Sequence, residues 1–336
     1  MQHKFGALDL IRAGLQDLDR ARTLFDELHN DGIDGDRMRL LLATLEKACD
    51  PDIALSNLVD IIKVMQSQGK DFTNIIADEN SFVRLITVLG VSDEMGKLMR
   101  FRPELVEAAA NDACESHLYN HEQRKAHVLK SVGADPNDHA MPTASLPLAE
   151  AATALRKTYR KQLSAIMAQD ATANGPIEIQ PRISTELSDL ADAALEGALA
   201  IARHEVDGSE HVRFAIIGMG KLGAQELNYV SDVDLIYVVE PADMDTNGMA
   251  LSRIGTKIAT TLQRVCQSVI MGVAEPTLWQ IDGGLRPEGK DGPLVRRLES
   301  HEAYYEQWAE NWEFQALLKA RPVAGDTDLG QAYMDM

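Results

Sequence analysis

The most constraining feature of the sequence is the stretch from Phe214 to Glu240, FAIIGMGKLGAQELNYVSDVDLIYVVE. It has an apolar run at each end, with glycines and acidic residues packed between them. Both runs have the length and the apolar content of buried strands. The stretch therefore predicts two strands joined by a glycine-rich connection, and the rest of a domain must be arranged around them.

The glycines of this connection predict a phosphate site. Gly218, Gly220 and Gly223 follow the first apolar run directly. Glycine lets the backbone turn tightly, and the N–H groups left free by such a turn bind anions well.

Two acids open the second apolar run. Asp232 and Asp234 are two residues apart, and the strand period of two places both carboxylates on one face. A third acid, Asp282, ends the next predicted strand. Carboxylate oxygens are the ligands that Mg²⁺ prefers, so the three aspartates predict a magnesium site.

This constellation is typical of nucleotidyl transfer. Metal ions would neutralise charge on the attacking and leaving oxygens, while glycine amides and cationic side chains hold the other phosphates. Lys221, Arg286 and Lys290 are available for those contacts. Lys221 and Glu226 could instead be surface or helix-capping residues, and Asp282 before Gly-Gly is also an ordinary turn residue.

A second reading is a dinucleotide-binding fold. The three glycines spell GxGxxG after a strand, and Glu240 stands near the place expected for a ribose ligand. However, only Ala224 to Ser231 separate the glycines from the acids, which is too short for a crossover helix between parallel strands.

Composition excludes several classes of protein. The 336 residues carry a formal net charge of −19, which argues against a nucleic-acid partner. No apolar run approaches the roughly 18 to 20 residues of a membrane span. The three cysteines, Cys49, Cys114 and Cys266, are far apart and fit reduced thiols, so we expect a cytoplasmic protein.

The first part of the chain reads as a helical region. Apolar residues recur at helical spacing from Ala7 to about Leu129, with breaks near 31–36, 50–51, 67–70 and 103. Residues 131–147 concentrate turn formers and predict a linker. We therefore expect a helical domain over 1–147 and a second domain over 148–336.

The second domain should be mixed. Helices are predicted over 148–169, from a cap at Ser184 or Thr185, over 248–270, and from Glu299 onward. A strand is expected over 277–282, followed by an exposed loop over 283–293 that contains Arg286 and Lys290. Four aromatic residues at helical spacing are expected in the core: Tyr304, Tyr305, Trp308 and Trp312. The fold class is α+β.

Three segments resemble the glutamine-synthetase adenylyltransferase family. They are GMGKLGAQELNYVSDVDLIYV, LRPEGKDGPLVR and AYYEQWAENWEFQALLKARPVAGD, and they occur in family order between about Phe214 and Asp326. A weaker likeness extends to LRKTYRKQL, from Leu155 to Leu163. The resemblance implies a nucleotidyltransferase-fold domain, a small mixed sheet flanked by helices, after the helical region.

The resemblance also implies a reaction. Family members attach AMP to a tyrosine of glutamine synthetase in one half and remove it by phosphorolysis in the other. This chain is similar to the N-terminal, deadenylylating half, which would release ADP and unmodified glutamine synthetase. The implied partners are adenylylated glutamine synthetase, phosphate and ADP, or ATP in the adenylylating direction, and the nitrogen-signalling PII protein.

The resemblance assigns residues to this reaction. Three aspartates would hold Mg²⁺ and serve catalysis: Asp232, Asp234 and Asp282. Six residues would bind the nucleotide or phosphate: Gly220, Lys221, Gly223, Ser231, Arg286 and Lys290. Ala224 and Gly284 depart from the family pattern, which removes one expected phosphate contact. Two alternatives stay open, namely the adenylylating half and a regulatory module that binds a nucleotide without turnover.

Overall fold

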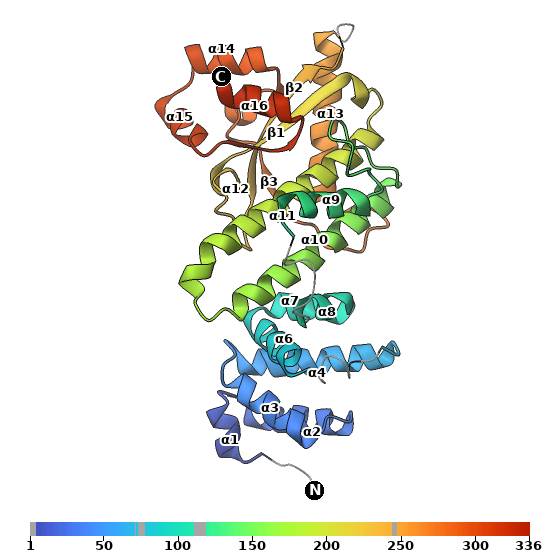
Figure 1. The fold of residues 1–336 in the computed structure, drawn as a ribbon, viewed down its shortest axis with the longest axis vertical. Helices are drawn as coiled ribbons and strands as arrows, with labels where there is room; N and C mark the ends of the chain where they lie inside the picture. The colour runs from blue at the N-terminus through green and yellow to red at the C-terminus, as the bar shows by residue number, and fades with distance from the viewer. Residues whose placement is uncertain (1–4, 71, 73–77, 111–118, 244–246) are drawn as a thin grey trace. The chain divides into compact units, whose positions relative to one another are not determined.

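The computed structural model describes residues 5–70, 72, 78–110, 119–243 and 247–336 (Figure 1). The chain divides into two compact units. The first contains residues 1–118 and 161–180, and the second contains 119–160 and 181–336. These units are defined by contacts, and the domain boundary expected at residue 147 stays a prediction.

The first unit is helical, as the spacing of its apolar residues predicts. Its helices are α1 (Ala7–Arg12), α2 (Leu18–Asn30), α3 (Gly35–Leu45), α4 (Pro51–Ser67), α6 (Glu79–Val91), α7 (Asp93–Phe101) and α8 (Glu104–Ala110). The predicted breaks act as helix caps: the carboxylates of Asp34 and Asp50 accept backbone N–H groups in the first turns of α3 and α4. Leu55, Leu58 and Ile62 lie in the core that these helices share. Cys114, one of the three expected thiols, lies outside the described residues.

Three helices precede the sheet in the sequence: α9 (His121–Ser131), α10 (Leu148–Ala171) and α11 (Pro176–Glu205). The predicted helix over 148–169 is confirmed by α10. The predicted start of α11 at Ser184 or Thr185 is wrong, because the helix begins at Pro176 and continues through Pro181. Pro181 removes only a bond near the start of the helix, and the long buried face from Ile183 to Arg203 outweighs that loss.

The second unit is built on a mixed sheet of five strands in the order β3-β2-β1-β5, with β4 also paired to β2. The strands are β1 (Val212–Gly218), β2 (Val233–Pro241), β3 (Ile281–Asp282), β4 (Val295–Arg296) and β5 (Arg321–Gly325). β1 pairs antiparallel with both β2 and β5, whereas β3 and β4 run parallel to β2. The α+β prediction is confirmed. The antiparallel β1–β2 pair excludes the dinucleotide fold, which needs a parallel βαβ unit.

Helices cover both faces of this sheet. Those after β2 are α13 (Gly248–Gln267), α14 (Leu298–Gln307), α15 (Asn311–Leu317) and α16 (Thr327–Asp335), and the short ones are η2 (Ser209–His211), α12 (Gly220–Gly223) and η3 (Gly289–Asp291). Leu329 and Tyr333 of α16 pack on the strand face that carries Ile217 and Ile236. Because side chains alternate along a strand, Tyr237 points the other way, where Gln263 of α13 donates to its hydroxyl at 3.3 Å.

Three expectations for the last part of the chain are wrong. The strand predicted over 277–282 is only Ile281–Asp282, and Arg321–Gly325, expected to be helical, is β5. β5 ends the strand order, where proline is tolerated, and its pairing is irregular opposite Ile216 and Ile217. Trp308 and Trp312 are 73% and 51% exposed, so they do not belong to the core.

A buried histidine on α14 should make this unit sensitive to acid. The ring of His301 stacks on Tyr305 and meets Tyr333 edge-on, and burial, with the nearby Arg296 charge, lowers its pKa to about 4. The unfolded chain binds this proton near pH 6.5, so between these values the unfolded state holds more protons. Acid therefore favours unfolding, by on the order of 3 kcal/mol once the pH is below both values.

His301→Phe keeps an aromatic ring in this position but removes the titration. We expect thermal unfolding midpoints measured at pH 7.5 and 4.5 to differ less in this variant than in the unmodified protein. His204→Phe, at an exposed position on α11, is the control and should leave the difference unchanged. An unaltered difference in His301→Phe would contradict the assignment.

Candidate nucleotide-transfer site

The glycine turn follows β1 as a single helical turn, α12, from Gly220 to Gly223. The Met219 N–H donates to the Asp234 carbonyl at 2.8 Å, which ties the turn to the start of β2. Gly220 has a φ of +54°, and a Cβ there would stand 2.5 Å from the Asp234 carboxylate. Glycine is thus required both for the backbone conformation and for the space beside this carboxylate.

The three predicted aspartates gather at one end of β2. Asp234 pairs in register with Asp282 on the adjacent parallel strand β3, and Asp232 immediately precedes β2. Asp234 is half-buried and Asp232 is exposed. Burial raises the pKa of Asp234, and the charges of Asp232 and Asp282 raise it further, against a smaller opposing effect of Lys221. The site therefore holds concentrated negative charge that a cation would relieve.

Two arginines of α10 hydrogen-bond to the chain segment that leads to Asp282. The guanidinium of Arg156, 1% exposed, donates to the carbonyls of Val265, Ser268 and Glu275 at 2.7 to 3.2 Å. One turn along, Arg160 donates to the Thr277 carbonyl at 2.6 Å. These buried bonds fix the segment between α13 and β3, and so fix the position at which β3 begins.

The loop after β3 is held together by one arginine. Arg286 was expected to be exposed, but it is half-buried and its guanidinium donates to the carbonyls of Gly283, Lys290 and Gly292 at 2.7 to 3.3 Å. The Gly284 N–H in turn donates to Asp282 Oδ1 at 2.6 Å. Arg286 thus shapes the loop that orients Asp282.

The other predicted binding residues lie around this centre. Lys221 is exposed in the glycine turn, close enough to affect the Asp234 charge. Ser231 is half-buried directly before Asp232, and Lys290 is exposed in the loop closed by Arg286. The structure therefore brings the glycine turn, the acids and Lys221 together.

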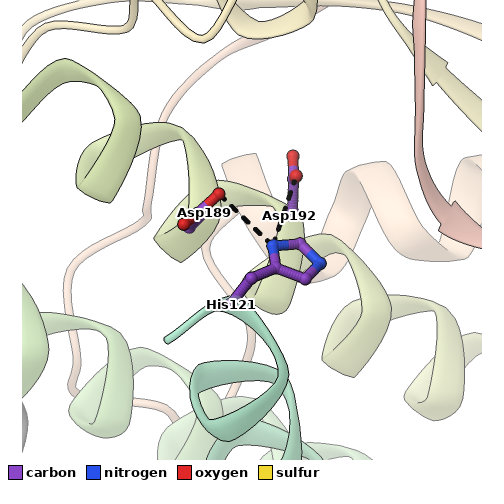
Figure 2. Close-up of side chains that lie close together, drawn as sticks. All are labelled: His121, Asp189 and Asp192. Atoms are coloured by element: carbon purple, nitrogen blue, oxygen red, sulfur yellow. Dashed lines mark hydrogen bonds and ion pairs between the residues drawn. The ribbon is translucent and has the colours of Figure 1, made fainter. Parts of the chain in front are cut away.

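A second group of titratable residues lies on α9 and α11. His121 Nδ1 is 3.3 Å from Asp189 Oδ1 and 3.9 Å from Asp192 Oδ2 (Figure 2). Within the described parts of the chain, this is the one group of three possible metal ligands whose atoms all lie within 4.8 Å of one another. The guanidinium of Arg321, however, already donates to both oxygens of Asp192, at 2.6 and 3.2 Å. A metal ion would have to displace that cation, so we interpret the group as an ion-pair network.

Sequence reasoning did not single out this network. Asp192 is 1% exposed, and burial raises its pKa to about 6 against the opposing effect of Arg321. Asp189 raises the pKa of His121. One feature of the sequence indicates such a network: an acid, Asp192, lies inside the alanine-rich stretch ADAALEGALA. A charge on a buried face of this kind needs a partner.

Acids at the ends of neighbouring strands beside a glycine turn can bind a metal ion and a phosphorylated ligand together. This combination of small mixed sheet, flanking helices and acidic edge defines a nucleotidyltransferase-type domain. The chain belongs to the family described as glutamate-ammonia ligase adenylyltransferase, whose family model matches residues 82–336.

Curated relatives agree with this assignment. A bifunctional glutamine synthetase adenylyltransferase/adenylyl-removing enzyme from Bifidobacterium longum (strain DJO10A) is 72% identical over 99% of this chain and 31% of its own length. Enzymes with the same name from Cutibacterium acnes and Streptomyces avermitilis are 40% and 37% identical over 98% and 97% of this chain. The chain spans about a third of the length of these relatives. Across the described residues, the helices are too short or too polar to cross a membrane.

Proposed function

We propose that this chain removes AMP from a tyrosine of glutamine synthetase by Mg²⁺-dependent phosphorolysis. The observation that carries the proposal is the pairing of Asp234 with Asp282 on adjacent strands, next to Asp232 and the glycine turn. The substrate is inferred from the names of the relatives, which act on glutamine synthetase.

The donor chemistry of the residues present fits a magnesium ion, although one oxygen from each of Asp232, Asp234 and Asp282 would come within the span of a single ion only after side-chain rotation. Three carboxylates offer the hard oxygen ligands that Mg²⁺ prefers, and the raised pKa of Asp234 reflects charge repulsion that a divalent cation would relieve. Gly220 leaves open the space beside the Asp234 carboxylate that a side chain would fill. When bound, the metal would supply charge neutralisation on the transferred phosphoryl group.

The proposed reaction joins phosphate to the AMP phosphorus. An oxygen of inorganic phosphate forms a bond to that phosphorus, and the bond from phosphorus to the tyrosine oxygen breaks. The tyrosine oxygen leaves with the bonding electrons and takes up a proton, which gives ADP and the free tyrosine. Asp232, Asp234 and Asp282 would hold the metal and orient the AMP phosphate for attack from the opposite side.

Three parts of the site would contact phosphates. The glycine turn, with Gly220 and Gly223, would offer backbone N–H groups, because Gly220 lies beside the Asp234 carboxylate, and Lys221 is an exposed cation of the same turn. Lys290 is the exposed cation of the loop, and Ser231 lies directly before the first aspartate. Arg286 would act by keeping that loop in shape, because its donors serve loop carbonyls.

The direction of the reaction is inferred from the resemblance of this chain to the deadenylylating half of the family. The few, widely spaced cysteines support a cytoplasmic enzyme with reduced thiols.

The PII protein is the regulatory partner implied by the resemblance, and we assign it no residue of this chain.

The test compares both directions with one preparation. The purified chain is incubated with adenylylated glutamine synthetase, Mg²⁺ and phosphate, and the nucleotides are separated by chromatography. We expect ADP to form, and to be absent when phosphate is omitted. A parallel mixture of unmodified glutamine synthetase with ATP and Mg²⁺ should release no pyrophosphate. Pyrophosphate there, without ADP in the first mixture, would assign the chain to adenylylation instead.

A further inference from the structure

We propose that Arg321, anchored on Asp192, is a positioning residue that sets the glycine turn beside Asp234. This inference rests on the proposed function for its catalytic consequence, although the geometry stands by itself. Arg321 is the first residue of β5, and its guanidinium donates to Asp192, Leu222 and Gly223 rather than to the three aspartates of the candidate site. Arg321 would affect the reaction indirectly, by fixing the position of the glycine turn.

One guanidinium joins three elements. Arg321 Nη1 and Nη2 donate to the two carboxylate oxygens of Asp192 on α11, at 2.6 and 3.2 Å. Nη2 also donates to the Leu222 carbonyl at 3.1 Å, and Nε donates to the Gly223 carbonyl at 3.3 Å. Both carbonyls belong to α12, so α11, the glycine turn and β5 share a single cation.

The glycine turn needs such support. A helix of four residues has too few internal bonds to be stable alone. The Leu222 carbonyl accepts the Gln225 N–H at 3.2 Å, and Arg321 adds a second donor to it and supplies the donor to the Gly223 carbonyl. Because Gly220 lies against the Asp234 carboxylate, a shift of the turn would change the surroundings of that carboxylate.

Gln225, the second residue after the glycine turn, also contacts α11. Gln225 has a φ of +57°, a conformation that costs a non-glycine residue energy, and its Nε2 donates to Asp189 Oδ1 at 3.2 Å. Asp189 and Asp192 are one turn apart on α11, with His121 beside both (Figure 2). Helix α11 is therefore linked to the glycine turn in two ways: Asp192 binds Arg321, which binds the carbonyls of the turn, and Asp189 binds Gln225.

The chain offers a matched comparison. Arg213 on β1 also makes a two-bond pair with a carboxylate, that of Asp326, at 2.7 and 2.8 Å, and both bonds lie away from the glycine turn. Lysine keeps the positive charge but cannot hold a carboxylate and two carbonyls at once. Arg321→Lys and Arg213→Lys therefore remove comparable ion-pair geometry, and only the first releases the turn.

The first readout is the kinetics of AMP removal. We expect Arg321→Lys to lower kcat by about 10- to 100-fold while KM for adenylylated glutamine synthetase changes by less than about twofold. Arg213→Lys should stay within about threefold of the unmodified protein in both parameters. Equal losses in the two variants, or a change in KM alone, would overturn the positioning role.

The second readout does not need activity. Amide hydrogen exchange of a peptide covering residues 219–226 should be about tenfold faster in Arg321→Lys than in Arg213→Lys. If the unmodified chain makes no product, the proposed function fails while this readout still tests the inference. Should Arg321→Lys not fold, Asp192→Asn serves instead and should change exchange and kcat in the same direction. Unchanged exchange in the turn would refute the proposal.

Discussion

Replacing Asp234 with asparagine is expected to lower the rate of AMP removal by about 1,000-fold, which corresponds to roughly 4 kcal/mol of lost transition-state stabilisation. Asparagine keeps the size of the side chain but removes the negative charge that a magnesium ion requires. Asp234 is the member of the site with charged neighbours on both sides, Asp232 and Asp282. The measurement is the initial rate of ADP formation at saturating substrate.

The same substitution should not weaken the fold. Burial and the neighbouring acids raise the pKa of Asp234, so the folded protein binds this proton more tightly than the unfolded chain does. At neutral pH the ionised carboxylate therefore opposes folding, and Asp234→Asn should unfold at the same or a higher temperature in the presence of a chelator. Asp207→Asn, at an exposed acid outside the site, should leave the rate unaltered. A variant that is both inactive and clearly destabilised would indicate a structural role instead.

Replacing Gly223 with alanine is expected to destabilise the second unit by about 3 kcal/mol or more. A Cβ at this position would run into the carbonyl oxygen of Lys319, and it would stand 2.5 Å from the carbonyl oxygen of Gly218. Both obstacles are backbone atoms, so the turn and the start of β5 must move apart. The loss should be visible as a lower midpoint in urea unfolding and as a loss of ADP formation.

Gly248→Ala provides the matched control for this substitution. Gly248 is the first residue of α13, and a Cβ there would meet no atom of the described residues within 4 Å. Alanine should therefore be neutral, or stabilising by up to about 1 kcal/mol because it restricts the unfolded chain. Similar destabilisation of both variants would mean that the close packing around Gly223 is not the cause.

The elements with strong local patterns could be predicted from the sequence. The apolar runs before Gly218 and after Asp234 are β1 and β2, and helical spacing with Asp and Pro breaks predicts α3 and α4. In these elements the apolar period, the turn formers and the caps all favour the same structure. The α+β class follows from them.

The short strands could not be predicted, because pairing rather than local preference makes them. β3 and β4 have two residues each and exist through their bonds to β2. β5 contains proline and glycine, which disfavour strands, and it is held in place by contacts with α11 that lie 129 residues away in sequence. Periodicity within a short window contains no information on such partners.

The candidate site was predicted in part. The residues Gly220, Asp232 and Asp234 lie within one stretch of 15 residues, so a turn and a strand are enough to bring them together. The roles of Arg286 and Arg321 depend on which carbonyls their guanidinium groups reach, and the sequence does not contain that geometry. A cationic residue within a sequence motif can contact the ligand, or it can bind backbone carbonyls and hold the loop in shape, and the motif does not distinguish the two roles.

The most direct test of the central claim follows labelled phosphate. The chain is mixed with adenylylated glutamine synthetase, Mg²⁺ and radiolabelled inorganic phosphate, with Asp234→Asn and Asp207→Asn alongside. We predict that label enters ADP with the unmodified chain and with Asp207→Asn, that a chelator stops it, and that Asp234→Asn forms almost none. Labelled ADP at an undiminished rate with Asp234→Asn, or in the presence of the chelator, would contradict a magnesium-dependent reaction at this site.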